Sequence, residues 1–274
     1  MKYLFIIQGE GRGHMTQAMS LAQVLEERGH VVTAVYLGIS PLRTIPGYIK
    51  FFFGNKLKYF RSPNFIKSSD KKGINILLSF VYNLFRGPVY IYEIFRLSYI
   101  IRRTDADKVI NFYDMIGGLA YCISFSRKPY FVISHHYFFS HPNFVYPGNS
   151  PVQKLLLKLY SKFCALRFEK KIALSFSDSP DIPEKRLNII PPLIRKEVFS
   201  LKPFNGGYIL VYLLHSGFIP EIKKWVLRNP GIHVIVFTDM IEERELLSAD
   251  LTAEPLSGEK FIKALAGCDT LVCT

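Results

Sequence analysis

Residues 3–14 of the chain read YLFIIQGEGRGH, and they carry the strongest structural signal of its amino-terminal part. Five consecutive apolar residues, Tyr3 to Ile7, predict a strand that is covered on both faces, as strands in parallel sheets are. Glycines follow at positions 9, 11 and 13, and they let the backbone turn tightly and approach a ligand. The stretch therefore predicts a strand, a ligand-binding loop and then a helix.

The residues beyond this loop continue the same pattern. Met15, Met19, Ala22 and Leu25 recur at helical spacing, Gly29 ends the predicted helix, and a second strand is expected at residues 31–36. Four more strands are expected at residues 57–60, 108–112, 130–134 and 172–176. Strands that alternate with helices predict an α/β fold with a doubly wound parallel sheet.

A change in composition marks the end of this first domain. Prolines become frequent from residue 177 to residue 206, and the pair Gly206-Gly207 follows. We expect an amino-terminal Rossmann-like domain at residues 1–190, a linker at 191–206 and a partial carboxyl-terminal Rossmann-like domain at 207–274. In the second domain, strands are expected at 208–213, 233–237 and 270–273, and helices at 220–228 and 258–266.

The composition is that of a folded protein with an anionic partner. Apolar residues make up 49% of the 274 residues and charged residues 21%, which is typical of globular domains. The net charge of +13 suits nucleotide phosphates or anionic lipid. The sequence has no paired zinc ligands, no aromatic RNA-binding strand and no basic region followed by heptads, so we expect no nucleic-acid partner.

The cysteines and the amino terminus indicate the compartment. Cys122, Cys164, Cys268 and Cys273 show no CxxC spacing and suggest no disulfide framework. The first apolar run is shorter than the core of a signal peptide and has no cleavage site after it. These features predict a cytoplasmic protein.

Residues 48–103 are unusually rich in aromatic and basic side chains. Within them, the apolar stretch from Ile74 to Phe85 is too short to span a bilayer. Aromatic and basic residues together favour a helix at an anionic membrane surface, which would place the protein peripherally on the inner face of the membrane. The alternative interpretation is an ordinary helix and loop that cover the sheet.

The glycine-rich loop itself limits the ligand. Free N–H groups and the positive dipole end of the following helix can hold a phosphate or sugar oxygen. A dinucleotide fingerprint would need a glycine where His14 stands, and a P-loop would need Gly-Lys-Ser/Thr after the glycines. His14 instead suits a general base that takes a proton from a sugar hydroxyl, or it merely caps the helix.

Two motifs carry a resemblance to a known superfamily. GRGHMTQAMSLA at residues 11–22, followed by RGHVVT at residues 28–33, resembles the first βαβ unit of GT-B glycosyltransferases. One similar branch is family 28, whose enzyme adds N-acetylglucosamine to a lipid-linked peptidoglycan precursor. The other is the UDP-glycosyltransferase superfamily. The resemblance implies a GT-B fold of two Rossmann-like domains with parallel sheets.

The resemblance also implies roles for individual residues. His14 matches the general base, and Asp114 matches the acid that orients it, with Asn111 as a less favoured substitute. Asp114 is equally interpreted as the N-cap of a helix that starts near residue 115. Acceptor or phosphate contacts are implied for Gly9, Gly11, Arg12, Gly13, His135 and His136. A metal site at the adjacent histidines is the less favoured alternative.

On the donor side, Ser216 and Gly217 match a reduced glycine-rich loop after His215. The main donor motif does not occur before Thr274, so the resemblance implies a truncated second domain. We expect a hexosyltransferase that moves sugar from a UDP-sugar to a hydroxyl of a lipid or glycan acceptor, without cofactor or metal. The alternatives are a non-catalytic acceptor-binding or membrane-associated subunit, an inactive fragment that needs a partner for donor binding, and a protein related to the epimerases of the same fold.

Overall fold

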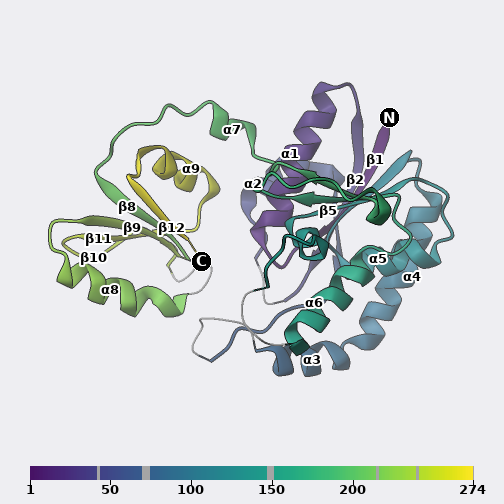
Figure 1. The fold of residues 1–274 in the computed structure, drawn as a ribbon, viewed down its shortest axis with the longest axis horizontal. Coiled ribbons are helices and arrows are strands. Elements are labelled where there is room, and N and C mark those ends of the chain that lie inside the picture. The colour runs from purple at the N-terminus through teal and green to yellow at the C-terminus, as the bar shows by residue number, and fades with distance from the viewer. Residues whose placement is uncertain (42–43, 70–74, 147–150, 214–215, 239–240, 274) are drawn as a thin grey trace. The chain divides into compact units, whose positions relative to one another are not determined.

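The structure is a computed structural model that describes residues 1–41, 44–69, 75–146, 151–213, 216–238 and 241–273. The chain divides into two compact units (Figure 1). The first unit comprises Met1–Asn64 and Val81–Arg195, and the second comprises Phe65–Phe80 and Lys196–Thr274. The domain boundaries expected from the sequence, at residues 190 and 207, remain a prediction.

The first unit is built on a seven-stranded sheet in which every pair of neighbours is parallel. The strand order is β3-β2-β1-β4-β5-β6-β7. The order reverses between β1 and β4, and the crevice outside the carboxyl ends of such strands is where doubly wound folds bind ligands. The strands are β1 (Lys2–Gln8), β2 (Val31–Ile39), β3 (Leu57–Arg61), β4 (Lys108–Phe112), β5 (Tyr130–Ser134), β6 (Lys170–Leu174) and β7 (Leu187–Ile190).

Helices cover both faces of this sheet because β1 buries alternate side chains on each side. Leu4 and Ile6 pack with residues of α4 (Gly87–Arg103), α5 (Met115–Ile123) and α6 (Pro151–Cys164). Phe5 and Ile7 pack with residues of α1 (Arg12–Glu27) and α2 (Gly47–Phe53). A Cβ at Gly118 of α5 would clash with the carbonyl oxygen of Phe163, so α5 and α6 approach closely. Short 3₁₀ turns are η1 (Gly54–Lys56), η2 (His135–Ser140) and η3 (Pro183–Lys185), and α3 (Ile76–Phe85) precedes α4.

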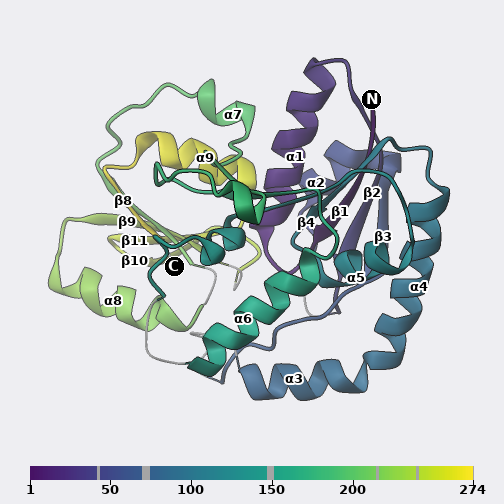
Figure 2. The same ribbon diagram turned by 45° about the vertical axis from the view of Figure 1, so that its right-hand side comes forward.

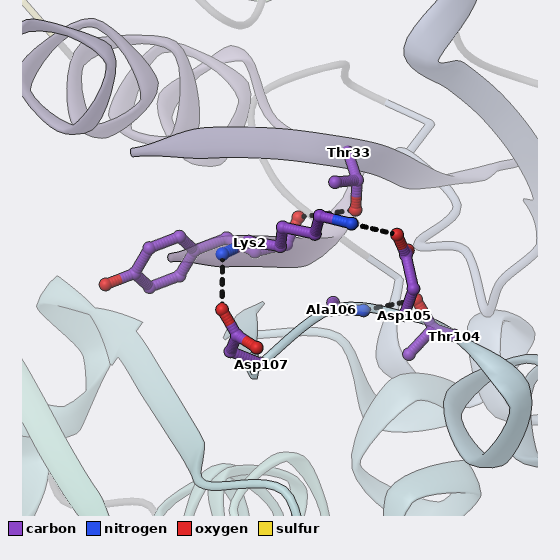
Figure 3. Close-up of polar contacts among 7 residues, drawn as sticks. Lys2, Thr33, Thr104, Asp105, Ala106 and Asp107 are labelled. Carbon is purple, nitrogen blue, oxygen red and sulfur yellow. Dashed lines mark hydrogen bonds and ion pairs between the residues drawn. The ribbon is translucent and has the colours of Figure 1, made fainter. Parts of the chain in front are cut away.

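Polar contacts fasten the start of β1 to the loop before β4 (Figure 3). The amide of Lys2 donates to the Asp107 carboxylate at 2.7 Å, and the Asp107 amide donates back to the Lys2 carbonyl at 2.8 Å. The Lys2 ammonium also reaches Asp105 at 2.7 Å, although both groups are exposed, so this ion pair adds little stability. The contacts set the register in which Tyr3 lies opposite Lys108.

The second unit carries a five-stranded mixed sheet in the order β10-β11-β9-β8-β12. Its core consists of buried aliphatic side chains such as Val211, Val236 and Leu251. β10 is antiparallel to β11, and the other neighbours are parallel. The elements are α7 (Lys196–Phe199), β8 (Tyr208–Tyr212), η4 (Ser216–Phe218), α8 (Ile219–Arg228), β9 (His233–Thr238), β10 (Glu245–Ser248), β11 (Leu251–Pro255), α9 (Gly258–Gly267) and β12 (Thr270–Cys273).

The predicted α/β class is confirmed, with the strands at 108–112, 130–134 and 270–273 at the predicted residues. The second sheet is mixed, because β10 forms an antiparallel hairpin with β11 that was not predicted from the sequence. The sequence analysis also missed β7, which lies within the proline-rich stretch, because four residues with a central asparagine give little periodicity. Among the described residues, no helix is both long and apolar enough to cross a membrane.

Candidate active site

The glycine loop after β1 leaves an open surface at the start of α1. A Cβ at Gly9 would clash with the carbonyl oxygen of Gly38, so only glycine fits there. A Cβ at Gly11 or Gly13 would meet nothing within 4 Å. Gly11 is the N-cap of α1 and has no side chain to cap it, and the N–H groups of a helix amino terminus together with its positive dipole end favour an anionic or oxygen ligand. Arg12, the first residue of α1, lies at the same place.

His14 is almost fully buried in the first turn of α1, with 4% of its surface exposed. Its ring packs on three other rings that follow the neighbouring strands β4 and β5. The ring centroids lie 5.6 Å from Tyr113, 5.6 Å from His135 and 5.4 Å from His136. The fold therefore brings together three of the predicted site residues, namely His14, His135 and His136.

The protonation state of His14 follows from this burial. Loss of water around the ring, assisted by His135, lowers the pKa of His14 to about 3, although the neighbouring Gln17 side chain acts to raise it. The imidazole is therefore neutral at pH 7 and is able to accept a proton. Its Nδ1 atom is buried and has no hydrogen-bond partner among the described residues. A buried, unpaired nitrogen is costly, which is typical of functional positions.

Asp114 is fully buried at the start of α5 and serves as its N-cap. One carboxylate oxygen accepts the Gly117 amide at 2.7 Å, and the other accepts the Ser62 hydroxyl at 2.6 Å. Burial raises the pKa of Asp114 to about 6 in spite of these two hydrogen bonds. Within the part of the chain that the structure describes, Asp114 makes no hydrogen bond to Nδ1 of His14, and its implied role in orienting His14 stays a prediction. The N-cap interpretation describes what Asp114 does in the structure.

Asn111 organises the turn between β4 and α5. Its amide nitrogen donates to the Asp114 carbonyl, the Tyr130 hydroxyl and the Cys164 carbonyl, at 2.8, 2.7 and 3.1 Å. Its amide oxygen accepts the Asp114 amide at 2.9 Å. These contacts engage the Asn111 side chain in holding the turn.

Tyr113 is a site residue that the sequence analysis missed. Its φ of 62° is left-handed, a conformation that a tyrosine rarely adopts and that often marks functional sites. The ring stacks on His136 at 4.4 Å, and its hydroxyl is 2.7 Å from that of Ser161 on α6. No sequence pattern predicts a tyrosine in the left-handed conformation, so this contact could be found only from the structure.

His135 and His136 open the turn η2 at the end of β5. Ser134 caps the turn by accepting the His136 amide at 3.0 Å, which fixes the direction of the chain. Burial lowers the pKa of His136 to about 2, so this ring is also neutral at pH 7. Nδ1 of His135 lies 3.5 Å from Nε2 of Gln17, a residue one turn after His14 that the sequence analysis did not single out. Oε1 of Gln17 is buried and unpaired.

The alternative of a metal site finds no geometric support in the part of the chain that the structure describes. Within it, no three histidine, cysteine or acidic side chains lie where they would hold a metal ion. The more distant His141 instead faces the carbonyl oxygen of Pro180 at 3.1 Å.

The residues expected on the donor side lie in the second unit. Ser216 and Gly217 belong to the turn η4, between the carboxyl end of β8 and α8. A loop in this position borders the ligand crevice of a doubly wound fold. His215, the first residue of the predicted motif, lies outside the described residues.

Comparison of the sequence with known protein families identifies the family of this chain. Residues 131–274, more than half of the sequence, match the family described as Glycosyl transferase family 1. The chain belongs to glycosyltransferase family 1. A search of curated protein sequences finds no match. The narrower resemblance to family 28 stays a prediction.

Solved structures that resemble this glycosyltransferase share its fold at low identity. UGT89C1 of Arabidopsis thaliana, complexed with UDP, is 13% identical with a TM-score of 0.53, over 99% of this chain and 75% of that one. UGT2 of Phytolacca americana, complexed with UDP-2fluoro-glucose and pterostilbene, is 12% identical with a TM-score of 0.52, over 99% and 76%. UDP-GlcNAc 2-epimerase of Neisseria meningitidis, bound to UDP-GlcNAc, is 13% identical with a TM-score of 0.57, over 100% and 77%. The predicted GT-B fold is confirmed.

Proposed function

We propose that this glycosyltransferase moves a sugar from a UDP-sugar to an acceptor hydroxyl, with His14 as the general base. The observation that carries the proposal is the neutral, buried His14 with its unpaired Nδ1 at the switch point of the first sheet. A base must be unprotonated before the reaction, and burial keeps His14 neutral at pH 7. A pKa of about 3 also makes the resting imidazole a weak base, so bound substrate must raise that pKa for the proton to transfer.

The chemical step is a direct displacement. The acceptor O–H gives its proton to the His14 imidazole while the oxygen forms a bond to the anomeric carbon. The bond from that carbon to the β-phosphate oxygen breaks, and UDP leaves with the electron pair. One displacement inverts the anomeric configuration. The step as written requires no metal ion or cofactor.

The open loop around the start of α1 suits the acceptor. In this proposal Gly9, Gly11, Arg12 and Gly13 form the surface on which a sugar or phosphate oxygen meets the amino-terminal end of α1. His135 and His136 line the other side of His14 and contact the acceptor.

Asp114 acts in this proposal as a positioning residue. It holds the start of α5 through Gly117 and therefore the preceding left-handed Tyr113, whose ring packs on His14. Asn111 supports the same turn. Substitution of Asp114 should therefore reduce kcat less than substitution of His14 does. Its effects should appear in the acceptor KM and in the pH profile.

For the donor, we propose that Ser216 and Gly217 contact the nucleotide. They follow the first strand of the second unit, at the carboxyl edge where such loops bind ligands. UGT89C1 complexed with UDP and UGT2 complexed with UDP-2fluoro-glucose support a UDP-linked donor, with a hexose as the sugar we favour.

We further propose a lipid-linked or glycan acceptor and a peripheral position on the inner face of a membrane. The support is the exposed apolar and aromatic side chains of residues 81–99, such as Phe85, Tyr92, Phe95 and Tyr99. Arg86 lies over the ring of Tyr82, and Arg103 lies over that of Tyr99, so basic groups accompany the aromatic ones. The chain also carries a net charge of +13.

Kinetics of His14→Ala test the base. We expect kcat for transfer to fall by about 10²- to 10⁴-fold, the usual contribution of general base catalysis, while UDP binding by titration calorimetry stays unchanged. His30→Ala is the matched control, because His30 lies at the other end of α1, beside Met1 and Tyr3. Retained turnover in His14→Ala would overturn the assignment.

The same assays distinguish two other functions from sugar transfer. A non-catalytic acceptor-binding subunit, or a fragment that needs a partner, would bind no UDP under any condition. A UDP-sugar epimerase, favoured by the likeness to the Neisseria meningitidis enzyme, would convert the donor into its epimer with no acceptor present. Nuclear magnetic resonance of the sugar product distinguishes epimerisation from transfer and reports the anomeric configuration.

A further inference from the structure

Helix α6 exposes apolar side chains over most of its length. Leu155 is 57% exposed and Val152 63%, and Leu156, Leu157 and Leu159 are exposed as well. Its buried face is narrow and includes the fully buried Cys164. Contiguous exposed apolar side chains of this kind are uncommon on the surface of a soluble protein, and they mark an interaction site.

The charges beside these leucines are all positive. Lys154, Lys158 and Lys162 recur at every fourth residue of α6, and residues 141–164 contain no aspartate or glutamate. Tyr146, just before the helix, lies under the ammonium groups of Lys154 and Lys158, at 4.6 and 5.9 Å from its ring centre. Leucine, lysine and an interfacial tyrosine together match an anionic lipid surface.

Two contacts fix how far α6 extends. The Tyr160 hydroxyl accepts a hydrogen bond from Gln8, the last residue of β1, and Ser161 contacts Tyr113, the first residue after β4. Residues 160 and 161 are therefore level with the carboxyl edge of the sheet. Because α6 connects the parallel strands β5 and β6, it runs back along them, and residues 151–159, about 13 Å of helix, lie beyond that edge. Figure 2 shows this half of α6 beyond the strand ends.

The projecting half begins close to the candidate active site. The ring of His136, which packs on His14, lies 5.4 Å from that of Phe139. The ring of Phe139 lies 6.0 Å from that of Tyr146, beneath Lys154. A bilayer seated on the start of α6 would therefore face the same edge of the sheet as His14.

We infer that residues 151–159 of α6, together with Tyr146, dock on an anionic phospholipid bilayer, and that the enzyme takes its acceptor from that bilayer as a lipid-anchored molecule. The inference rests on the proposed transfer reaction. It adds the docking element and the direction from which the acceptor arrives. A second copy of the chain fits less well, because a two-fold interface on α6 would bring the same lysines face to face.

Co-sedimentation with vesicles tests the docking. We expect the full-length protein to bind vesicles that contain phosphatidylglycerol more tightly than vesicles of phosphatidylcholine alone, and added salt should weaken that binding. Each lysine near an anionic surface contributes roughly fivefold, so Lys154→Gln/Lys158→Gln should weaken binding on the order of 30-fold. Lys223→Gln/Lys224→Gln on α8 removes the same charge from another exposed helix and should weaken it far less.

The apolar contribution is tested separately. Leu155→Ser/Leu156→Ser should reduce binding to both kinds of vesicle, whereas Leu227→Ser/Leu246→Ser, at exposed leucines of the second unit, should leave it unchanged. Circular dichroism verifies that each variant is folded. Equal binding by the α6 and control variants, or no preference of the wild type for anionic lipid, would overturn the inference. Self-association that the leucine variant abolishes would overturn it in favour of a dimer.

The two proposals fail separately. Vesicle binding through α6 by a protein that transfers no sugar would refute the proposed function and leave the docking surface standing. Transfer by a protein that ignores vesicles would do the reverse. His14→Ala should bind vesicles as the wild type does, and the α6 variants should bind UDP as the wild type does.

Discussion

Acidification should destabilise the first unit through its buried histidines. The pKa is about 3 for His14 and about 2 for His136 in the folded chain, against an ordinary value of 6.5. Between about pH 6.5 and pH 3 the unfolded chain therefore binds up to two more protons at these residues, so the free energy of unfolding falls as the pH falls through that range.

Asp114 acts in the opposite direction. Its pKa is about 6 when folded and 3.8 ordinarily, so between about pH 4 and pH 6 the folded chain binds one more proton there. From the two histidines and this carboxyl group, the unfolded state gains a net one proton. These groups should lower the stability by about 1 kcal/mol per pH unit in that range.

His14→Asn/His136→Asn removes both histidine contributions and leaves Asp114. The contribution of the site should then change sign, so that acidification from about pH 6 to pH 4 stabilises the variant relative to the wild type. The difference between the two proteins should change by about 3 kcal/mol per pH unit, and the contributions of unrelated surface groups cancel in that difference.

Urea unfolding at a series of pH values measures this effect. Far-ultraviolet circular dichroism follows both units, and fluorescence of Trp225, the single tryptophan, reports on the second unit, which contains neither histidine. The reasoning is refuted if the stability curves of wild type and variant run parallel from pH 4 to pH 6.5. Parallel curves would mean that these histidines titrate in the folded chain as they do in the unfolded one.

Two further predictions concern the packing and the turn that support the site. Gly118→Ala should lower the free energy of unfolding by about 1–3 kcal/mol in chemical denaturation, because the added Cβ would push α6 away from α5. Gly87→Ala is the control and should leave the free energy of unfolding unchanged, because its Cβ would meet no described atom within 4 Å. Asp114→Ala should lower the free energy of unfolding by about 1–2 kcal/mol, because the N-cap is lost and Ser62 is left unpaired. Asp114→Asn keeps an acceptor for the Gly117 amide and should lower it less. Equal losses in the two variants would contradict the capping argument.

Much of the fold followed from local pattern. A continuous apolar run predicts a buried parallel strand, and glycines before a helical repeat predict the turn into α1, whatever the rest of the chain does. Hence β1, β4 and β5 were found near their actual bounds. β7 and the β10–β11 hairpin were not found, because short strands are stabilised by their neighbours in the sheet more than by their own residues.

Residues 3–28 alone predict that His14 lies where the glycine-rich loop meets the helix of a strand–loop–helix unit. The surroundings of His14 depend on how the strands are ordered in the sheet. The strand order places β4 beside β1 and β5 beside β4, and this brings Tyr113 and His136 onto the His14 ring. It also directs the Asp114 carboxylate toward Ser62, which follows the distant β3. Contacts between strand ends depend on sheet order and on a left-handed turn, and no local spacing in the sequence encodes either.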